Sequence, residues 1–303
     1  MWSAVRVVLL VVVIMLAIMW LFEERLIFFP SRYPEGRWDL PQIARRQGVV
    51  IEDCYFQTSD GLKLHGWYCQ GRTDDQTGQR DDGKSASLPG AVLLWFHGNA
   101  GNITDRYEQI PDLVGLPADV FIIDYRGYGR SEGRPSEAGL YLDAQAAWDY
   151  LTQQRGVGAE RIVIFGKSVG GAPAIELATH VDAAGLIAES TFTSVRDMAA
   201  QLYPFLPRFM LRTKMDSLSR IGQVRCPKLF IHGPADEIVP YGLGRKLFDA
   251  ASEPKAFLDV PGAGHNETHL VAGPAYTQRF RQFLAQCLAS GVQPSAERAN
   301  DPR

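Results

Sequence analysis

Short apolar runs recur along most of the chain, and each run ends in residues that favour turns. Six of them lack a polar-apolar alternation: residues 91–96, 120–124, 161–165, 185–188, 228–231 and 256–260. Runs of this length and composition are typical of strands that are buried on both faces of a parallel sheet. We therefore expect a mostly parallel sheet.

Helical periodicity fills the gaps between these runs. Apolar residues from Leu140 to Leu151 fall on one helical face, and Ser136 is placed to cap the start of that helix. A last helix is expected near residues 276–288, followed by a frayed tail over residues 289–303. The polar residues 70–89 indicate an exposed loop. The alternation of strands and helices predicts an α/β fold with helices on both faces of the sheet.

An antiparallel hairpin precedes the first buried run. Two alternating segments, which begin at Cys54 and end at Cys69, meet at the turn signal Asp60-Gly61. If the loop spans residues 60–63, Cys54 faces Cys69 and a disulfide is feasible, which would indicate an oxidising compartment. The alternative is a pair of reduced cysteines, because a loop one residue shorter removes the pairing.

The N-terminus carries the longest apolar segment. Residues 7–22 read VVLLVVVIMLAIMWLF, without a charge. A helix over residues 2–22 would be about 31 Å long, close to the thickness of a bilayer core. No small-residue cleavage site follows, which argues against a signal peptide. We expect residues 1–25 to form a single-pass transmembrane anchor. Basic residues on both sides leave its orientation open, and the cysteine pair favours an extracytoplasmic catalytic domain.

Charge and composition limit the classes of partner and cofactor that we expect. The 303 residues include 31 Lys and Arg against 34 Asp and Glu, a formal net charge of −3. This balance argues against nucleic acid as a main partner, because phosphate-binding surfaces need a cationic excess. No nucleotide-binding loop or credible metal site is evident, so no cofactor is expected. In the segment His265-Asn266-Glu267-Thr268-His269 the acid is misplaced for an H-E-x-x-H zinc motif.

The sharpest chemical signal is Gly166-Lys167-Ser168-Val169-Gly170, between a predicted strand and a predicted helix. In that position G-x-S-x-G predicts a turn so tight that glycine is needed on both sides of the serine. The turn raises the hydroxyl above the sheet edge. Ser168 is therefore the candidate nucleophile.

A nucleophilic serine needs a base and a carboxylate that orients it. His265 lies in a glycine-rich loop after the last strand and is the leading base, with His269 weaker. His97 and His232 each close a strand and are expected to pack under the site. Asp236 follows the strand of residues 228–231 and is the leading acid; Glu189 and Asp259 are its rivals.

Donors for a developing oxyanion are expected in the loop His97-Gly98-Asn99-Ala100-Gly101-Asn102. The backbone N–H groups of Asn99 and Val169 are the leading pair, with Ala100 as an alternative to Asn99. One such donor typically contributes about 3–4 kcal/mol of transition-state stabilisation.

Together these motifs resemble the membrane-anchored α/β-hydrolase-domain proteins, which are related to protein depalmitoylases and lysophospholipases. A more remote similarity is to prolyl-oligopeptidase peptidases. The segments that carry the resemblance to the α/β-hydrolase-domain proteins are HGNAGNI, DYRGYGRSEGRPSE, GKSVGG, HGPADEIVP and GAGHN. The resemblance implies a Ser168/Asp236/His265 triad, in the chain order typical of this fold. It also implies that residues 124–127 form a structural turn. Pro234 departs from the polar residue that many relatives carry.

The resemblance implies an α/β-hydrolase domain over residues 26–288, with a short cap at about residues 190–226. The cap has room for one or two helices, and its apolar residues either receive an acyl chain or simply pack in the core. The expected activity is a serine hydrolase that cleaves acyl esters or thioesters, of lipids or lipidated proteins, at a membrane surface. The alternatives are an aminopeptidase-like peptidase and a non-catalytic membrane-tethered scaffold.

Overall fold

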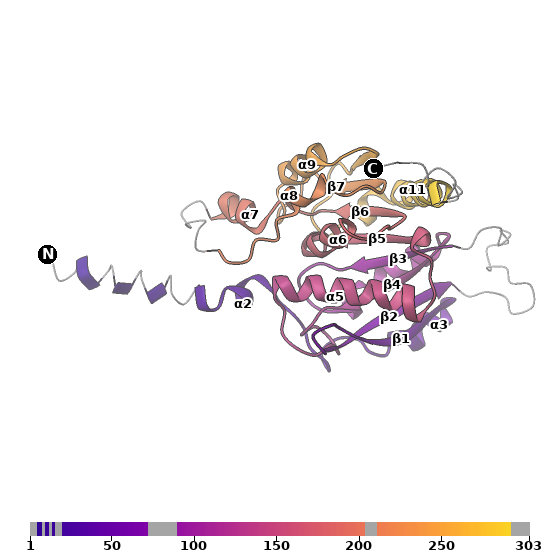
Figure 1. Ribbon diagram of the computed structural model, residues 1–303, viewed down its shortest axis with the longest axis horizontal. Helices are drawn as coiled ribbons and strands as arrows, with labels where there is room; N and C mark the ends of the chain where they lie inside the picture. Colours follow the sequence, from indigo (N-terminus) through magenta and orange to yellow (C-terminus); the bar gives the residue numbers. More distant parts are fainter. Residues whose placement is uncertain are drawn as a thin grey trace, which may run out of the picture.

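A mixed sheet of eight strands forms the centre of the computed structural model, which describes residues 5–7, 10–11, 14–15, 20–71, 90–203 and 211–291 (Figure 1). The strand order is β1-β2-β4-β3-β5-β6-β7-β8. The strands are β1 (Val49–Gln57), β2 (Lys63–Gly71), β3 (Ala91–Phe96), β4 (Ala118–Asp124), β5 (Ile162–Lys167), β6 (Gly185–Glu189), β7 (Lys228–His232) and β8 (Lys255–Asp259).

Only the N-terminal hairpin interrupts the parallel arrangement of the described strands. β2 is antiparallel to both of its neighbours, β1 and β4, and every pairing from β4 to β8 is parallel. The six predicted buried runs all became strands, with bounds that differ from the prediction by at most two residues. The predicted fold class, a mostly parallel α/β sheet with an antiparallel hairpin, is confirmed.

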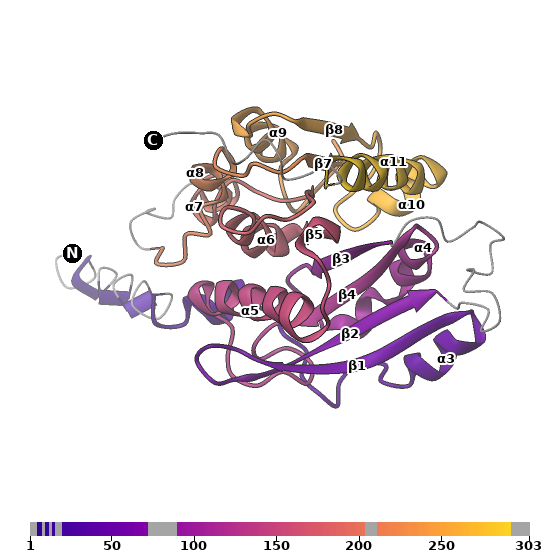
Figure 2. The ribbon, with the colours of Figure 1, turned by 45° about the vertical axis from the view of Figure 1, so that its right-hand side comes forward.

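Helices cover both faces of the sheet (Figure 2). One face packs against α5 (Glu137–Asp149), α6 (Gly171–Ala178), α8 (Ser217–Ile221) and α9 (Tyr241–Ala250). The other face packs against α3 (Leu40–Arg46), α4 (Ile110–Val114) and α11 (Pro274–Gly291). Ser136 caps α5 as predicted, because its hydroxyl accepts a hydrogen bond from Gly139 N at 3.1 Å.

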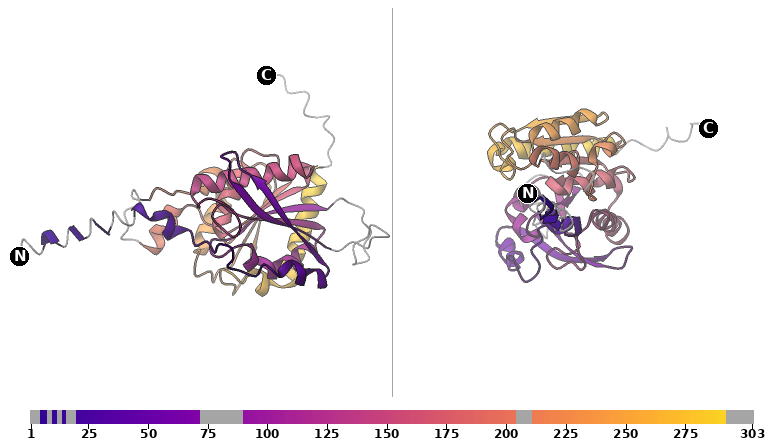
Figure 3. Two further views of the ribbon diagram at one scale, coloured as in Figure 1. Left: turned by 90° about the horizontal axis from the view of Figure 1, so that it is seen from below. Right: turned by 90° about the vertical axis from the view of Figure 1, so that its left-hand side faces the viewer.

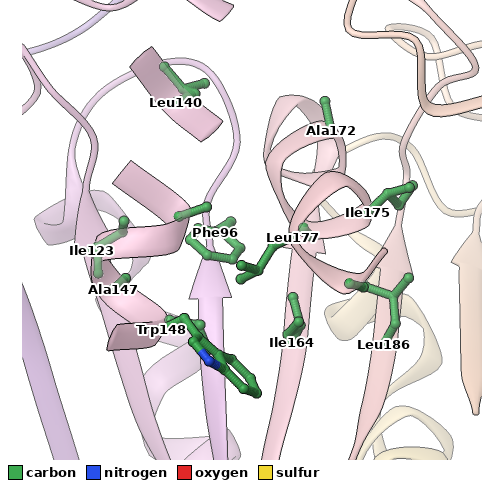
Figure 4. Close-up of a cluster of buried hydrophobic side chains, with 14 of the residues drawn as sticks. Phe96, Ile123, Leu140, Ala147, Trp148, Ile164, Ala172, Ile175, Leu177 and Leu186 are labelled. Carbon is green, nitrogen blue, oxygen red and sulfur yellow. The ribbon is translucent and has the colours of Figure 1, made fainter. Parts of the chain in front are cut away.

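The hydrophobic core has one half on each side of the sheet, and single strands supply both halves. In β3, Val92, Leu94 and Phe96 face the α5–α6 side, whereas Leu93 and Trp95 face α4 and α11. Figure 4 shows the first half, in which Leu140, Ala147 and Trp148 of α5 belong to the same cluster as Phe96 and Ile164 of the sheet. Burial on both faces explains why these strands lack alternation. The core fixes the strand ends that carry the candidate site.

The hairpin register differs from the one that would pair two cysteines. Cys54 lies opposite Gly66, Cys69 lies opposite Ile51, and both thiols are free and buried. Hydrogen bonds between Thr58 and Leu62 close the loop, from Thr58 N to Leu62 O at 2.9 Å and from Leu62 N to the Thr58 hydroxyl at 3.0 Å. The two thiols also belong to opposite faces of the sheet. Of the two alternatives, the structure has the pair of reduced cysteines, and the argument that a disulfide would have given for an extracytoplasmic domain is lost.

Several expectations concern residues outside those described. These are most of the apolar run of residues 7–22, the loop of residues 72–89, the middle of the cap at residues 204–210, and the tail beyond residue 291. Among the helices that the structure does describe, none combines the length and the apolar character needed to cross a membrane. The described part of the predicted cap segment contains two helices, α7 (Val195–Leu202) and α8.

Candidate active site

Ser168 stands on a sharp turn between β5 and α6. Its φ angle of 54° is in the left-handed region that non-glycine residues rarely adopt. A short 3₁₀ turn, η4 (Ser168–Gly170), leads directly into α6. The strained backbone and the strand-turn-helix setting match the geometry that the G-x-S-x-G motif predicts. The turn places the serine at the carboxyl edge of the parallel sheet.

The glycines on either side of Ser168 are required by close approach of the backbone. A Cβ atom on Gly166 would lie 2.6 Å from the Cβ of Ala174 and from Gly170 O. A Cβ atom on Gly170 would overlap the carbonyl oxygen of Phe96, at the end of β3. These glycines therefore let β3, β5 and α6 pack closely around the serine.

Three residues from different strand ends form one hydrogen-bonded chain. Ser168 Oγ lies 3.0 Å from His265 Nε2, and His265 Nδ1 lies 2.8 Å from Asp236 Oδ2. Ser168 follows β5, Asp236 follows β7, and His265 follows β8. Because the carboxyl ends of parallel strands meet at one sheet edge, residues far apart in sequence come together here. The structure thus brings together the three residues that the sequence nominates.

The carboxylate of Asp236 is held by four groups. Its Oδ1 accepts hydrogen bonds from Ile238 N at 2.9 Å and from Val239 N at 2.7 Å. Its Oδ2 binds His265 and lies 3.1 Å from His232 Nε2. Burial alone would raise the pKa of Asp236, but the hydrogen bonds from His232 and His265 outweigh it and hold the pKa well below its usual range. Asp236 is therefore a fixed carboxylate that orients the imidazole.

The rival acid Glu189 is fully buried and engaged elsewhere. Its carboxylate forms an ion pair with Lys167 at 2.8 Å and accepts hydrogen bonds from Thr268 Oγ1 and Tyr276 OH, both at 2.6 Å. The charge and hydrogen bond of Lys167 outweigh burial and lower the pKa of Glu189 below 4.5. The other rival, Asp259, accepts a hydrogen bond from Tyr241 OH. Neither rival is bonded to His265.

The predicted oxyanion loop lies directly beside Ser168, the candidate nucleophile. A Cβ atom on Gly98 would lie 3.5 Å from the Cβ of Ser168. Within the described residues no acceptor pairs with the backbone N–H of Asn99. Val169, the other expected donor, directly follows Ser168 in η4. The Asn99 side chain forms hydrogen bonds to protein groups. A residue that served only to form a turn would leave its side chain in solvent.

The remaining histidines have other partners. His97 is fully buried, with its Nδ1 2.6 Å from Gly98 O, and burial lowers its pKa to about 3. Its ring is therefore neutral and packs against Tyr125. His65 bridges Asp53 at 2.7 Å and Asp124 at 3.4 Å. His269 contacts the ring of Tyr276.

The turn of residues 124–127 has the structural contacts that the resemblance implies. Arg126 donates through Nε to Asp143 at 2.8 Å and through Nη1 to Asp60 at 2.9 Å. The Asp124 carboxylate accepts a hydrogen bond from Ile103 N at 3.0 Å. These contacts fasten the loop after β4 to α5 and to the hairpin.

Sequence reasoning missed three residues around the site. The second partner of Asp236, His232, was expected only to pack, although its spacing of four residues from Asp236 was a signal. Lys167 lies inside the serine motif, where it was read as a variable position. Glu23 follows the apolar run of residues 7–22, and nothing in the pattern indicates that its carboxylate is buried in the folded domain.

Comparison with known proteins agrees with this architecture. The family model described as "alpha/beta hydrolase fold" matches residues 91–214. An uncharacterized protein of Mycobacterium tuberculosis is 38% identical over 95% of this chain and 96% of its own length. The α/β-hydrolase domain-containing protein WAV2 of Arabidopsis thaliana is 34% identical, over 90% of this chain and 91% of its own.

A solved structure has the same fold. The esterase Pf2001 of Pyrococcus furiosus superimposes with a TM-score of 0.66 at 19% identity, over 86% of this chain and 97% of its own. The resemblance drawn from the motifs is thereby confirmed at the level of the superfamily. This chain belongs to the α/β-hydrolase superfamily.

Proposed function

We propose that this protein is a serine hydrolase that cleaves acyl esters or thioesters through an acyl-enzyme formed on Ser168. The observation that carries the proposal is the hydrogen-bonded chain from Ser168 through His265 to Asp236. A serine hydroxyl is a weak nucleophile unless a neighbouring base takes its proton, and the base works best when a third group orients it. All three groups are present at hydrogen-bonding distance.

The acylation step follows from this arrangement. Ser168 Oγ attacks the substrate carbonyl carbon while its proton passes to His265 Nε2. The imidazolium that forms is stabilised by the Asp236 carboxylate on its Nδ1 side. The carbonyl oxygen gains negative charge, which the N–H groups of Asn99 and Val169 would stabilise. His265 then gives its proton to the leaving oxygen or sulfur as the bond to it breaks.

Deacylation uses the same groups in the reverse order. A water molecule gives a proton to His265 Nε2 and attacks the acyl carbon. The bond to Ser168 Oγ breaks, and the proton returns from His265 to that oxygen. The products are a carboxylic acid and the free enzyme, so the cycle needs no cofactor.

The surroundings favour an apolar acyl group presented at a membrane. Ile238, two residues after Asp236, is an exposed apolar side chain, and Leu202 at the end of α7 is another in the cap segment. The apolar run of residues 7–22 supports a membrane anchor as part of the proposal. An anchored site would meet lipid-borne esters at a high local concentration.

The proposal is tested by labelling the purified full-length protein with a fluorophosphonate probe and mapping the modified peptide. We expect the adduct on Ser168, and we expect no labelling of His265→Ala, because the serine then lacks its base. Thermal unfolding of His265→Ala should stay close to that of the wild type. A series of esters and thioesters of increasing chain length then defines the substrate.

Two results would overturn the proposal. One is a folded wild-type protein that does not react with the probe, which would favour a membrane-tethered scaffold. The other is equal labelling of the wild type and of His265→Ala, because the serine would then react without activation.

A further inference from the structure

The segment between the apolar N-terminal run and the first strand is bonded to the catalytic edge of the sheet. Residues 23–29, here called the strap, comprise α2 (Glu23–Ile27) and the two phenylalanines that follow. Phe28 is buried in the core, whereas Phe29 is exposed. α2 and α7 lie at the same end of the molecule (Figures 1 and 3).

The C-terminal end of the strap is bound by the side chain of Asn99. Its Nδ2 donates to Ile27 O, and its Oδ1 accepts from Phe29 N at 3.2 Å. Tyr128 OH donates to the same Oδ1 at 3.1 Å. One side chain therefore connects the strap, the loop after β3 and the loop after β4.

The backbone adds further bonds beside this side chain. Gly101 N donates to Phe29 O at 3.1 Å, and Ser31 N donates to Gly101 O at 3.0 Å. Gly129 N donates to Ser31 O at 2.9 Å. The chain that follows the strap thus runs between the loops after β3 and β4 and bonds to both.

The N-terminal end of the strap is bound to the segment that returns from the cap. Glu23 is only 4% exposed. Its carboxylate accepts hydrogen bonds from Arg212 N at 3.1 Å, Arg212 Nε at 3.2 Å and Thr213 N at 3.0 Å. The strap is therefore fixed at both ends.

We infer that the Asn99 side chain and the strap position the oxyanion hole. This inference rests on the proposed function. The backbone N–H of Asn99 is the donor expected to face the developing oxyanion, and a loop donor contributes only when it is held in place before the reaction. The Asn99 side chain forms three hydrogen bonds, which hold in place the residue that carries this N–H. Asn99 is on this view a positioning residue whose side chain touches no substrate.

Asn99 combines two roles, because its backbone N–H is the expected donor and its side chain would hold that donor in place. Alanine at position 99 keeps the backbone N–H but loses every bond to the strap and to Tyr128. If only the amide mattered, the substitution would be silent. If the side chain positions the amide, transition-state stabilisation falls while substrate binding changes little.

The test compares Asn99→Ala with Arg32→Ala in the full-length protein, with rates expressed per fluorophosphonate-reactive site. Arg32 is the control, because its Nη2 donates to Gly133 O at 2.6 Å and so joins the same stretch of chain to the loop after β4 from outside the oxyanion loop. We expect kcat of Asn99→Ala to fall about 10- to 100-fold at a nearly constant KM. Arg32→Ala should lower the melting temperature slightly and leave kcat unchanged.

An unchanged kcat in Asn99→Ala, or an equal fall in kcat in Arg32→Ala, overturns the inference. Ester turnover by the wild type would still uphold the proposed function. A wild-type protein without turnover or labelling removes both. If Asn99→Ala does not fold, Tyr128→Phe replaces it, because this change removes one hydrogen bond to Asn99 Oδ1. A several-fold fall in kcat is then expected, and an unaltered kcat is the contrary result.

Discussion

The side chain of Asp236 illustrates how single residues at this site depend on their neighbours. Two backbone N–H groups and two imidazoles surround one carboxylate. His232 Nε2 also lies 3.0 Å from Val239 O, so the same ring contacts the loop that holds the carboxylate. A carboxylate with this many donors stays ionised and keeps one orientation. The proton on His265 is thereby directed to Nδ1, which leaves Nε2 free to accept a proton from Ser168.

Asp236→Asn should separate orientation from packing. An asparagine of the same shape places an amide where His265 Nδ1 now donates, which favours the tautomer with the proton on Nε2. That tautomer cannot take the proton of Ser168, and a loss of kcat of about 10⁴-fold is expected. The measurement is the steady-state hydrolysis of an activated ester.

Asp259→Asn provides the comparison, because it makes the same change in the rival acid, which is the last residue of the neighbouring strand β8. Its kcat should match that of the wild type. A large loss in Asp259→Asn together with a small loss in Asp236→Asn would mean that the acid has been misassigned.

At the scale of elements, the Lys167–Glu189 ion pair joins the parts of the chain that carry Ser168 and His265. Lys167 ends β5 just before Ser168, and Glu189 ends β6. Glu189 also binds Thr268 of α10 (Thr268–Ala272) and Tyr276 of α11, which follow the His265 loop. One buried carboxylate thus fixes the sheet edge relative to the loop that carries His265.

Glu189→Gln should destabilise the fold strongly, because it leaves the buried ammonium of Lys167 without its charge partner. Breaking such a pair typically costs about 3–5 kcal/mol. The free energy of unfolding in urea measures it. The control is Lys246→Ala, which removes an exposed partner of Asp197 at 3.4 Å and should cost at most about 1 kcal/mol. Equal costs in the two variants would contradict the role given to the pair.

The same variant should alter the response of stability to acid. The pKa of Glu189 in the folded protein is below its ordinary value of 4.5, so its contribution is complete above that pH. The contribution is lost as the pH falls through the folded pKa, because the unfolded chain then binds the proton more readily. The free energy of unfolding of Glu189→Gln should therefore fall less steeply with acid below pH 4.5 than that of the wild type.

The extent to which the sequence predicts these elements differs from one to the next. The run of residues 91–96 matches β3 at both ends, because burial on both faces requires an unbroken apolar segment. The hairpin was found, but its register was wrong, because register depends on side-chain hydrogen bonds of Thr58 within the turn. The residues Ser168, Asp236 and His265 were nominated by motif and strand-end position, which the parallel topology makes informative. The strap was not foreseen, because its bonds join residues about seventy positions apart.

At the scale of the whole molecule, the strap fixes the distance between the N-terminal apolar run and the catalytic edge. That run ends at Phe22, and Ile27, a partner of Asn99, follows five residues later. Five helical residues rise about 7.5 Å. If residues 7–22 span a bilayer, the oxyanion loop is therefore held close to the membrane surface. A substrate that stays in the bilayer would then reach Ser168 with little displacement.

Two truncations test how far the catalytic domain depends on its N-terminus. Deletion of residues 1–25 removes the apolar run and the Glu23 end of the strap, but it keeps Ile27 and Phe29, the partners of Asn99. We therefore expect a soluble enzyme that unfolds somewhat more easily and keeps most of the wild-type kcat. Deletion of residues 1–29 also removes buried Phe28 and both partners of Asn99 in the strap. Loss of a buried Phe typically costs about 3–5 kcal/mol, so this protein should unfold more easily as well as turn over more slowly.

Detergent-free purification, thermal unfolding and ester hydrolysis compare the two truncated proteins with the wild type. Insolubility of the shorter deletion would mean that the apolar run packs on the domain, and equal activity of both proteins would mean that the site functions without the strap.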